Sequence, residues 1–227
     1  MLAVQKTEKF KIKHLKKNFI YSRNLIREEF LKDNKSLKNC RKNSDLIDKL
    51  ISHIFKRYQS FDKSFTNHLC ICAVGGYGRR DLAPFSDLDL LCIYKSTVNN
   101  KETQNLIKKI LYPLWDFGLK IGYAVRDEKE SISLAKKDHI IQTSMLDARF
   151  VCGSKKIFSN VIDDFKNNIC ANGYELLKKK INERKKRIVE VGNDYFRNEP
   201  NLKESEGSLR DINLIFWGLK ILHISFQ

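Results

Sequence analysis

Apolar residues recur at helical spacing in the first quarter of the chain. Within residues 45–58 they fall on one face of a helix, as Leu46, Ile47, Leu50, Ile51, Ile54, Phe55 and Tyr58. This period predicts an amphipathic helix. Ser44 or Asp45 is predicted to cap its N-terminus, because serine and aspartate are favoured at that position. An earlier helix is predicted over residues 18–33. Together they predict an N-terminal helical segment, residues 1–65.

The pattern then changes to short apolar runs bounded by glycine and polar residues. Three such runs predict strands, at residues 67–74, 87–94 and 119–127. A helical turn is predicted after Gly75 and Gly76, and a helix over residues 103–118 that Pro113 bends or interrupts. Residues 66–150 are therefore predicted to hold a small sheet flanked by helices, which makes the fold class α+β.

The last third of the chain is predicted to be helical. Helical, charge-rich spacing begins near Ser131, and residues 151–227 are predicted to form a C-terminal helical segment. Its last helix carries an apolar face made of Leu209, Ile212, Phe216, Leu219 and Leu222. An exposed face of this kind indicates a surface covered by a partner or by further residues. We interpret Arg210 and Asp211 in the same helix as a polar pair within it.

Composition narrows the class of protein. The chain has 227 residues, of which 42% are hydrophobic, so it can bury a core. No apolar run approaches the roughly 20 residues of a membrane span, and the lysine-rich N-terminus does not read as a secretory signal. Six cysteines occur without a CxxC pair, and Cys70, Cys72 and Cys92 lie among apolar residues. We therefore expect buried free thiols, no structural metal and a cytoplasmic protein that does not enter a membrane.

The charge of the chain raises the question of a nucleic-acid partner. The formal net charge is +16, and basic surfaces attract phosphate backbones. However, 31 of the 43 basic residues are lysines spread along nearly the whole chain, with little interleaving of aromatic residues. This distribution favours a solvated, lysine-rich surface, so a nucleic-acid partner is not expected.

The run AVGGYGRRDLAPFSDLDLLCIY, residues 73–94, holds the candidate chemistry. Asp87 and Asp89 lie two residues apart on a predicted strand, so both carboxylates point to the same face, about 6–7 Å apart. Two carboxylates so placed can bind Mg²⁺, which prefers oxygen ligands. Bound metal ions of this kind stabilise the attacking and leaving oxygens of an in-line phosphoryl displacement.

The glycines and basic residues of the same run fit a nucleotide. Gly75 and Gly76 follow a strand, where backbone N–H groups can approach phosphate oxygens without a Cβ in the way. Arg79 or Arg80 would add positive charge, and Ser86 a hydroxyl donor. Each feature alone also fits a tight turn or a solvated strand end. Their combination in this order indicates a nucleotide-binding site.

Four blocks carry a resemblance to a known family. In chain order, GGYGRRDLAPFSDLDLL, LWDFGLKIGYAVRD, LDARFVCG and EGSLRDIN resemble the N-terminal part of the bacterial bifunctional PII uridylyltransferase/uridylyl-removing enzymes. These belong to the polymerase beta-like nucleotidyltransferase superfamily, whose fold has a small mixed sheet. The resemblance implies transfer of UMP from UTP to a tyrosine of the PII nitrogen-regulatory protein, with release of pyrophosphate. It implies Asp87 and Asp89 as catalytic ligands of Mg²⁺, with Mn²⁺ as the alternative metal, and Gly75 and Gly76 as triphosphate-binding residues.

Some features depart from the family or leave alternatives open. The superfamily fold normally supplies a third carboxylate, for which Asp127 and Asp147 are candidates; each also fits a surface or capping acid. Arg80 stands where the family's loop usually has glycine. The His-Asp doublet of the hydrolase domain is absent, so we interpret the chain as truncated and expect no uridylyl removal. Two other functions stay open: nucleotidyl transfer to RNA or a small molecule, and an inactive fragment that binds UTP or PII.

Overall fold

The protein divides into two compact units. The computed structural model describes residues 2–59, 67–98, 100–170, 173–191, 199 and 201–225. One part, the sheet unit, comprises Met1–Lys129 and Asp147–Ser159, and the other, the helical unit, comprises Glu130–Leu146 and Asn160–Gln227. Among the described residues, no helix combines the length and the apolar character needed to cross a membrane.

A four-stranded mixed sheet organises the sheet unit. Its strands are β1 (Leu69–Ala73), β2 (Leu88–Tyr94), β3 (Ile121–Asp127) and β4 (Arg149–Gly153), in the order β3-β2-β1-β4. β1 is antiparallel to β2 and β4, whereas β2 is parallel to β3. The predicted small mixed sheet flanked by helices is confirmed, and its first three strands lie within the predicted runs.

The fourth strand corrects the expectation of helix from Ser131 onward. α6 (Glu128–Lys137) and α7 (His139–Leu146) are helical, but the chain then returns to the sheet, where Arg149 pairs with Ala73 of β1. The five residues of β4 contain a single β-branched side chain, Val151, so local pattern does not reveal the strand. Its pairing with a strand far away in sequence decides the structure.

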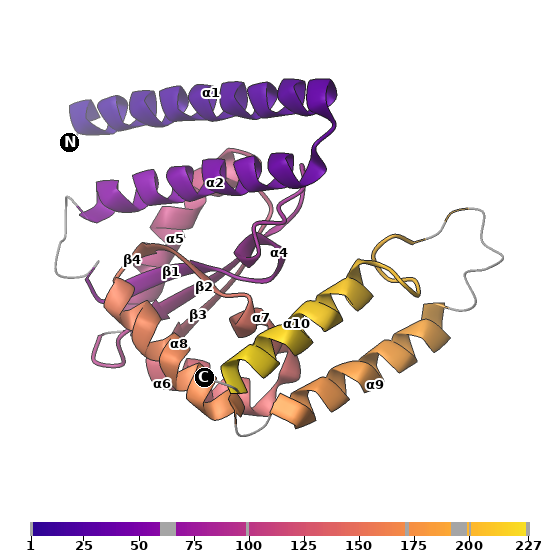
Figure 1. Ribbon diagram of the computed structural model, residues 1–227. Helices are drawn as coiled ribbons and strands as arrows, with labels where there is room; N and C mark the ends of the chain where they lie inside the picture. Colours follow the sequence, from indigo (N-terminus) through magenta and orange to yellow (C-terminus); the bar gives the residue numbers. More distant parts are fainter. Residues whose placement is uncertain are drawn as a thin grey trace. The chain divides into compact units, whose positions relative to one another are not determined.

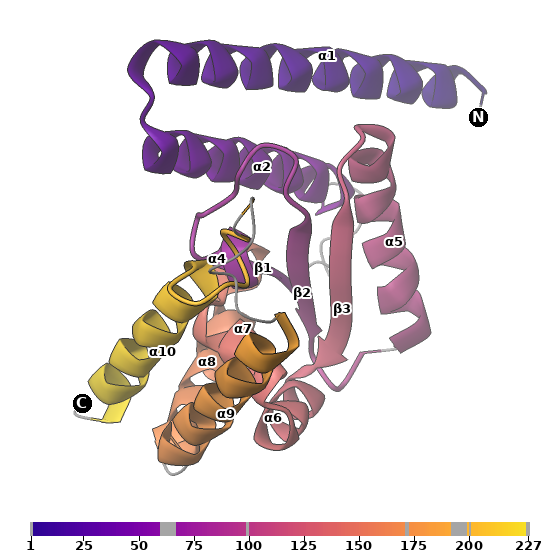
Figure 2. The same cartoon turned by 90° about the vertical axis from the view of Figure 1, so that its right-hand side faces the viewer.

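Two stacked helices lie over one face of the sheet, and the inner one packs against the strands. α1 (Leu2–Asp33) and α2 (Ser36–Gln59) lie antiparallel, with α2 between α1 and the strands (Figures 1 and 2). α2 and α5 (Asn100–Asp116) share a buried core with the strands, which includes Ile51, Phe55, Ile71, Leu88, Leu90, Ile107, Ile110 and Leu114. This core holds β2, and with it the residues at the start of β2, in a fixed position.

The predicted cap of the second helix is wrong. α2 begins at Ser36 rather than near residue 45, and Ser44 is buried inside it. The Ser44 hydroxyl donates to the carbonyl of Cys40, 2.9 Å away. A serine inside a helix can bond the carbonyl four residues earlier in this way. The residue type at position 44 therefore does not distinguish a cap from a helix interior.

α5 continues through Pro113 to Asp116, so the proline does not interrupt the helix. A proline has no N–H to donate to the carbonyl four residues before it, here that of Lys109. The hydroxyl of Tyr58, on α2, donates to the Lys109 carbonyl at 3.0 Å. A side chain from the neighbouring helix thus replaces the hydrogen bond that the proline removes.

Further helices continue after β4. They are α8 (Lys155–Cys170), which crosses the boundary between the units, α9 (Gly173–Val191) and α10 (Leu209–Ser225). In the helical unit, α9 and α10 lie side by side and antiparallel (Figure 1). The helical run that the sequence predicts across residues 192–196 lies outside the described residues.

Charged side chains join α9 to α10. Asp211 accepts from Arg184 at 2.9 Å and from Arg187 at 2.7 Å, and Arg210 approaches Glu204 at 3.3 Å. The interpretation of Arg210 and Asp211 as a pair within one helix is therefore wrong. Consecutive helical residues do not face each other, so each finds its partner elsewhere.

The apolar face predicted on α10 is exposed. Five of its side chains are between 44% and 57% exposed: Leu209, Ile212, Phe216, Leu219 and Leu222. On the other side of the helix, Trp217 is buried, and the centroid of its ring lies 5.1 Å from the ammonium nitrogen of Lys180. The helix is therefore anchored to its own unit by one side only.

Candidate active site

The two aspartates lie at the N-terminal end of β2. Asp89 is the second residue of β2, and Asp87 directly precedes the first residue of β2. Both aspartates are exposed. Leu88 and Leu90, by contrast, are only 1% and 2% exposed. Because successive residues of a strand alternate between faces, the leucines enter the core while both carboxylates project from the other face.

Asp89 lies between two glycines. The turn α4 (Gly75–Gly78) follows β1, and the Val74 N–H donates to the Asp89 carbonyl at 3.0 Å. A Cβ at Gly75 would lie 3.2 Å from Oδ2 of Asp89, and a Cβ at Gly122 would lie 3.1 Å from Oδ1. Gly75 also has φ +56°, a conformation that glycine adopts without steric cost. The two glycines thus leave space around the carboxylate.

Gly122 was not among the residues singled out from the sequence. It pairs with Asp89 in the parallel register of β2 and β3. The available signal was a glycine inside a strand, which often marks a close approach of another group. Only the strand pairing identifies that group as Asp89.

Arg79 lies beside the glycine turn and contacts two carboxylates. Its Nη1 donates to Oδ2 of Asp147 at 2.5 Å, and its Nε donates to Oδ2 of Asp81 at 2.9 Å. Its Nη2 would lie 3.9 Å from a Cβ at Gly76. The structure therefore brings Arg79 to the turn, as an ion pair with a carboxylate whose side chain has no exposed surface.

Of the two candidates for a third carboxylate, Asp127 lies far from the glycines around Asp89, whereas Asp147 lies beside the glycine turn. Asp127 pairs with Tyr94 at the far end of the sheet, five positions along β3 from Gly122, or about 16 Å at ~3.3 Å per residue. Asp147 is directed at Arg79. Within the described ranges, no group of three His, Cys, Asp or Glu residues is placed to hold a metal ion. The carboxylates that share the face of the site are Asp87 and Asp89.

A partly buried polar network contacts the turn. Arg149 donates to both carboxylate oxygens of Asp48, at 2.6 and 3.1 Å, and the Tyr77 hydroxyl donates to the same carboxylate at 2.6 Å. Arg149 also donates to the backbone carbonyls of Tyr77 and Gly78, each at 3.2 Å. Burial, together with the neighbouring Asp48 carboxylate, raises the pKa of Tyr77 well above its usual value, so the phenol stays protonated and donates.

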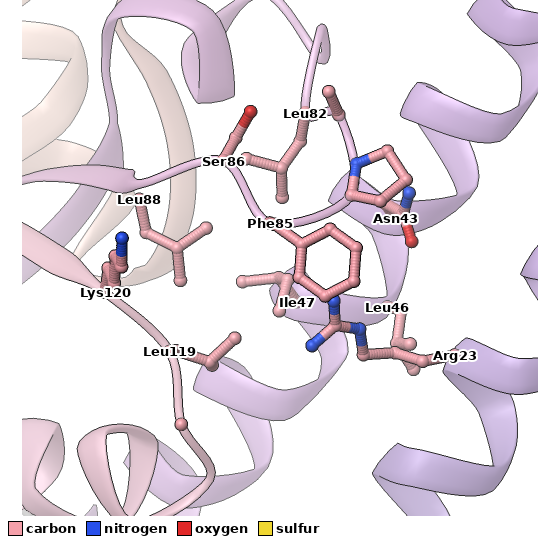
Figure 3. A pocket seen from close by; sticks show the side chains of 13 residues that line it. Arg23, Asn43, Leu46, Ile47, Leu82, Phe85, Ser86, Leu88, Leu119 and Lys120 are labelled. Carbon is pink, nitrogen blue, oxygen red and sulfur yellow. The ribbon is translucent and has the colours of Figure 1, made fainter.

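A cavity of about 210 Å³ lies beneath the loop that joins α4 to β2 (Figure 3). Leu88 lines it, so it opens on the opposite face of β2 from the two carboxylates. Ser86 lies at its edge, and in Figure 3 the Ser86 hydroxyl points away from the ring of Phe85. Phe85 is 87% exposed with φ +70°, and the guanidinium of Arg23 lies 5.4 Å from its ring.

Arg80 also has a left-handed backbone, with φ +65°. Glycine adopts this conformation without strain, whereas other residues do so at a cost. The position where this chain departs from the usual glycine of the family is thus one where glycine would be favoured. The Arg80 side chain forms an exposed ion pair with Asp45 of α2 at 2.7 Å.

Comparison with known proteins finds two family models that match parts of the chain. The model of the nucleotidyltransferase domain matches residues 54–149, and that of GlnD PII-uridylyltransferase matches residues 175–225. The first match contains α4, both aspartates, the strands β1, β2 and β3, and the first residue of β4. The chain carries a nucleotidyltransferase domain.

Full-length relatives agree with this assignment. The bifunctional uridylyltransferase/uridylyl-removing enzyme of Phenylobacterium zucineum is 34% identical over 91% of this chain and 23% of its own length. Those of Caulobacter vibrioides and Azospirillum brasilense are 40% and 38% identical, over 68% and 78% of this chain and 16% and 19% of their own. The predicted resemblance is confirmed, and the chain spans less than a quarter of the length of these relatives.

Proposed function

We propose that this chain is a metal-dependent uridylyltransferase that moves UMP from UTP to a tyrosine of a PII-type protein and releases pyrophosphate. One observation carries the proposal. Asp89, with Asp87 beside it, projects from the sheet between Gly75 and Gly122, next to a glycine turn that can receive phosphates. The substrates themselves are inferred from the similarity to uridylyltransferases.

The donor set fits Mg²⁺ or Mn²⁺. Asp87 and Asp89 provide oxygen ligands on one exposed face, and the glycines on either side of Asp89 leave room for phosphate oxygens. A divalent ion held there would offset the charge of the triphosphate and stabilise the pyrophosphate as it leaves. Two protein carboxylates suffice for such an ion when substrate phosphates complete its coordination.

The residues of the chain orient the substrate for in-line attack. Backbone N–H groups at Gly75 and Gly76 bind phosphate oxygens, which places the α-phosphorus near the two carboxylates. The tyrosine hydroxyl of the acceptor then loses its proton to solvent and its oxygen forms a bond to the α-phosphorus, while the bond from that phosphorus to the bridging oxygen of pyrophosphate breaks. Arg79, beside the turn, adds positive charge, although its ion pair with Asp147 limits how far it can reach.

Transfer of label from α-labelled UTP to a PII-type protein in the presence of Mg²⁺ tests the proposal. Asp87→Asn and Asp89→Asn remove the metal-binding charge with little change of shape and should abolish transfer. Glu102→Gln is the matched control, because Glu102 is an exposed carboxylate in the first turn of α5. Transfer that persists in both aspartate variants, or that fails in the folded wild type, would overturn the proposal.

The acceptor needs a parallel assay. The net charge of +16 favours RNA as the alternative acceptor, since a basic surface attracts phosphate backbones. Labelled RNA with unlabelled PII would support transfer to RNA. UTP binding without transfer to either acceptor would support an inactive binding fragment.

A further inference from the structure

We propose that Asp147 and Arg149 are positioning residues that clamp the glycine turn Gly75–Gly78 against the sheet. They would act through the turn, by setting the position of its phosphate-binding backbone relative to Asp89. The inference rests on the proposed function, because it assumes that the turn binds the triphosphate. It gives Asp147 a role other than that of a third metal ligand.

Arg149 holds the C-terminal end of the turn. Its guanidinium donates to the carbonyls of Tyr77 and Gly78, and the Tyr77 carbonyl also accepts from the Arg80 N–H at 3.1 Å. A cation at the C-terminal end of a helix is also favoured electrostatically. The same guanidinium is oriented by the two oxygens of Asp48 on α2, so it cannot rotate without losing several hydrogen bonds.

Asp147 contacts the same end of the turn. Its buried carboxylate pairs with Arg79, the residue that directly follows the turn. Its backbone carbonyl lies so close to Gly78 that a Cβ there would be only 2.1 Å from the oxygen. The segment of residues 147–149 therefore contacts the turn through an ion pair, two hydrogen bonds and direct backbone packing.

The clamp is connected to the metal-binding carboxylate through the sheet. Ala73, the last residue of β1, pairs with Arg149 on one side and with Leu90 on the other. The next residue, Val74, donates to the carbonyl of Asp89. Gly75 then passes beside the Asp89 carboxylate. A shift of residues 147–149 would therefore move the turn relative to Asp89.

Arg149→Lys tests the clamp, because it keeps the charge but loses the forked geometry that bonds Asp48 and two carbonyls together. Tyr58→Phe is the control: it removes one hydrogen bond between α2 and α5 in the same unit. Both variants are first checked for folding by urea denaturation. Hydrogen exchange at the amides of Gly78 and Arg79, which bond the carbonyls of Val74 and Gly75, then reports the order of the turn.

We expect faster exchange at these two amides in Arg149→Lys alone. We also expect kcat/KM for UTP to fall about 10- to 100-fold, through a higher KM together with a lower kcat, since a displacement near 1 Å can cost this much. When Asp48→Asn is combined with Arg149→Lys, kcat/KM should fall little further, because both substitutions act on one network. A role limited to overall stability would lower the urea midpoint and leave the kinetics of the folded enzyme unchanged.

The possible outcomes distinguish a failure of the clamp proposal from a failure of the proposed function. Unchanged exchange at the turn overturns the clamp, whatever the activity. So does normal UTP affinity in a folded Arg149→Lys variant when the wild type binds UTP. A wild type that neither binds UTP nor transfers UMP overturns the proposed function instead, and the exchange data then decide whether residues 147–149 order the turn.

Discussion

Replacing Gly76 by alanine separates the needs of the fold from those of a ligand. A Cβ at this position would have one heavy atom within 4 Å, Nη2 of Arg79 at 3.9 Å, which is an ordinary contact with the end of a flexible side chain. The protein itself therefore has room for alanine. Because glycine loses more conformational freedom on folding, the variant should be as stable as the wild type or more so, by about 0.5–1 kcal/mol.

Binding of UTP should respond in the opposite direction. If the backbone at Gly76 contacts phosphate, a Cβ there obstructs the approach, and the loss of one charged hydrogen bond of about 1.5–3 kcal/mol weakens binding at least about tenfold. Urea denaturation and calorimetric titration with UTP and Mg²⁺ measure the two effects separately. A folded Gly76→Ala variant that binds UTP like the wild type would refute the reasoning.

Gly78→Ala is the contrasting control within the same turn. Its Cβ would lie 2.1 Å from the Asp147 carbonyl oxygen, whereas ordinary contact begins at 3.4 Å, so the backbone must move by about 1.3 Å, the difference between the two. Such overpacking should cost about 1–3 kcal/mol of stability. Gly78→Ala is therefore expected to lose both stability and UTP binding, whereas Gly76→Ala loses binding alone.

Two further predictions concern backbone strain and charge. At Phe85, whose φ is +70°, glycine should give a more stable protein than alanine, by up to about 1 kcal/mol in urea denaturation; a more stable alanine variant would exclude the left-handed backbone. Asp211→Asn should destabilise the protein by about 2 kcal/mol at pH 7, because Arg184 and Arg187 lose a charged acceptor. Burial alone would raise the pKa of Asp211. The hydrogen bonds from Arg184 and the Gly207 N–H and the charge of Arg187 lower it by more, so the net pKa lies below the ordinary 3.8. This stabilisation is present above pH 3.8 and is lost as the pH falls through the folded-state pKa, so thermal melts of wild type and variant should converge in acid; a constant difference would contradict the assignment.

Local pattern was enough to predict much of the fold. The alternation in residues 87–94 predicts that Leu88 and Leu90 enter the core while Asp87 and Asp89 face outward, and the structure shows this arrangement. The helical period of residues 45–58 likewise predicts the buried face of α2. Both succeed because burial on one face imposes a period of 2 or 3.6 on the sequence itself.

Long-range contacts decided the rest. β4, the placement of Gly122 beside Asp89, the pairing of Asp147 with Arg79 and the Tyr58 bond that accommodates Pro113 all join residues distant in sequence. None of these contacts produces a periodic pattern in the sequence, because each depends on which segments meet after the chain folds. The sequence by itself determined the strand that carries the carboxylates and the glycine turn before it. Only the tertiary structure decided what surrounds them, since side chains acquire their partners through packing.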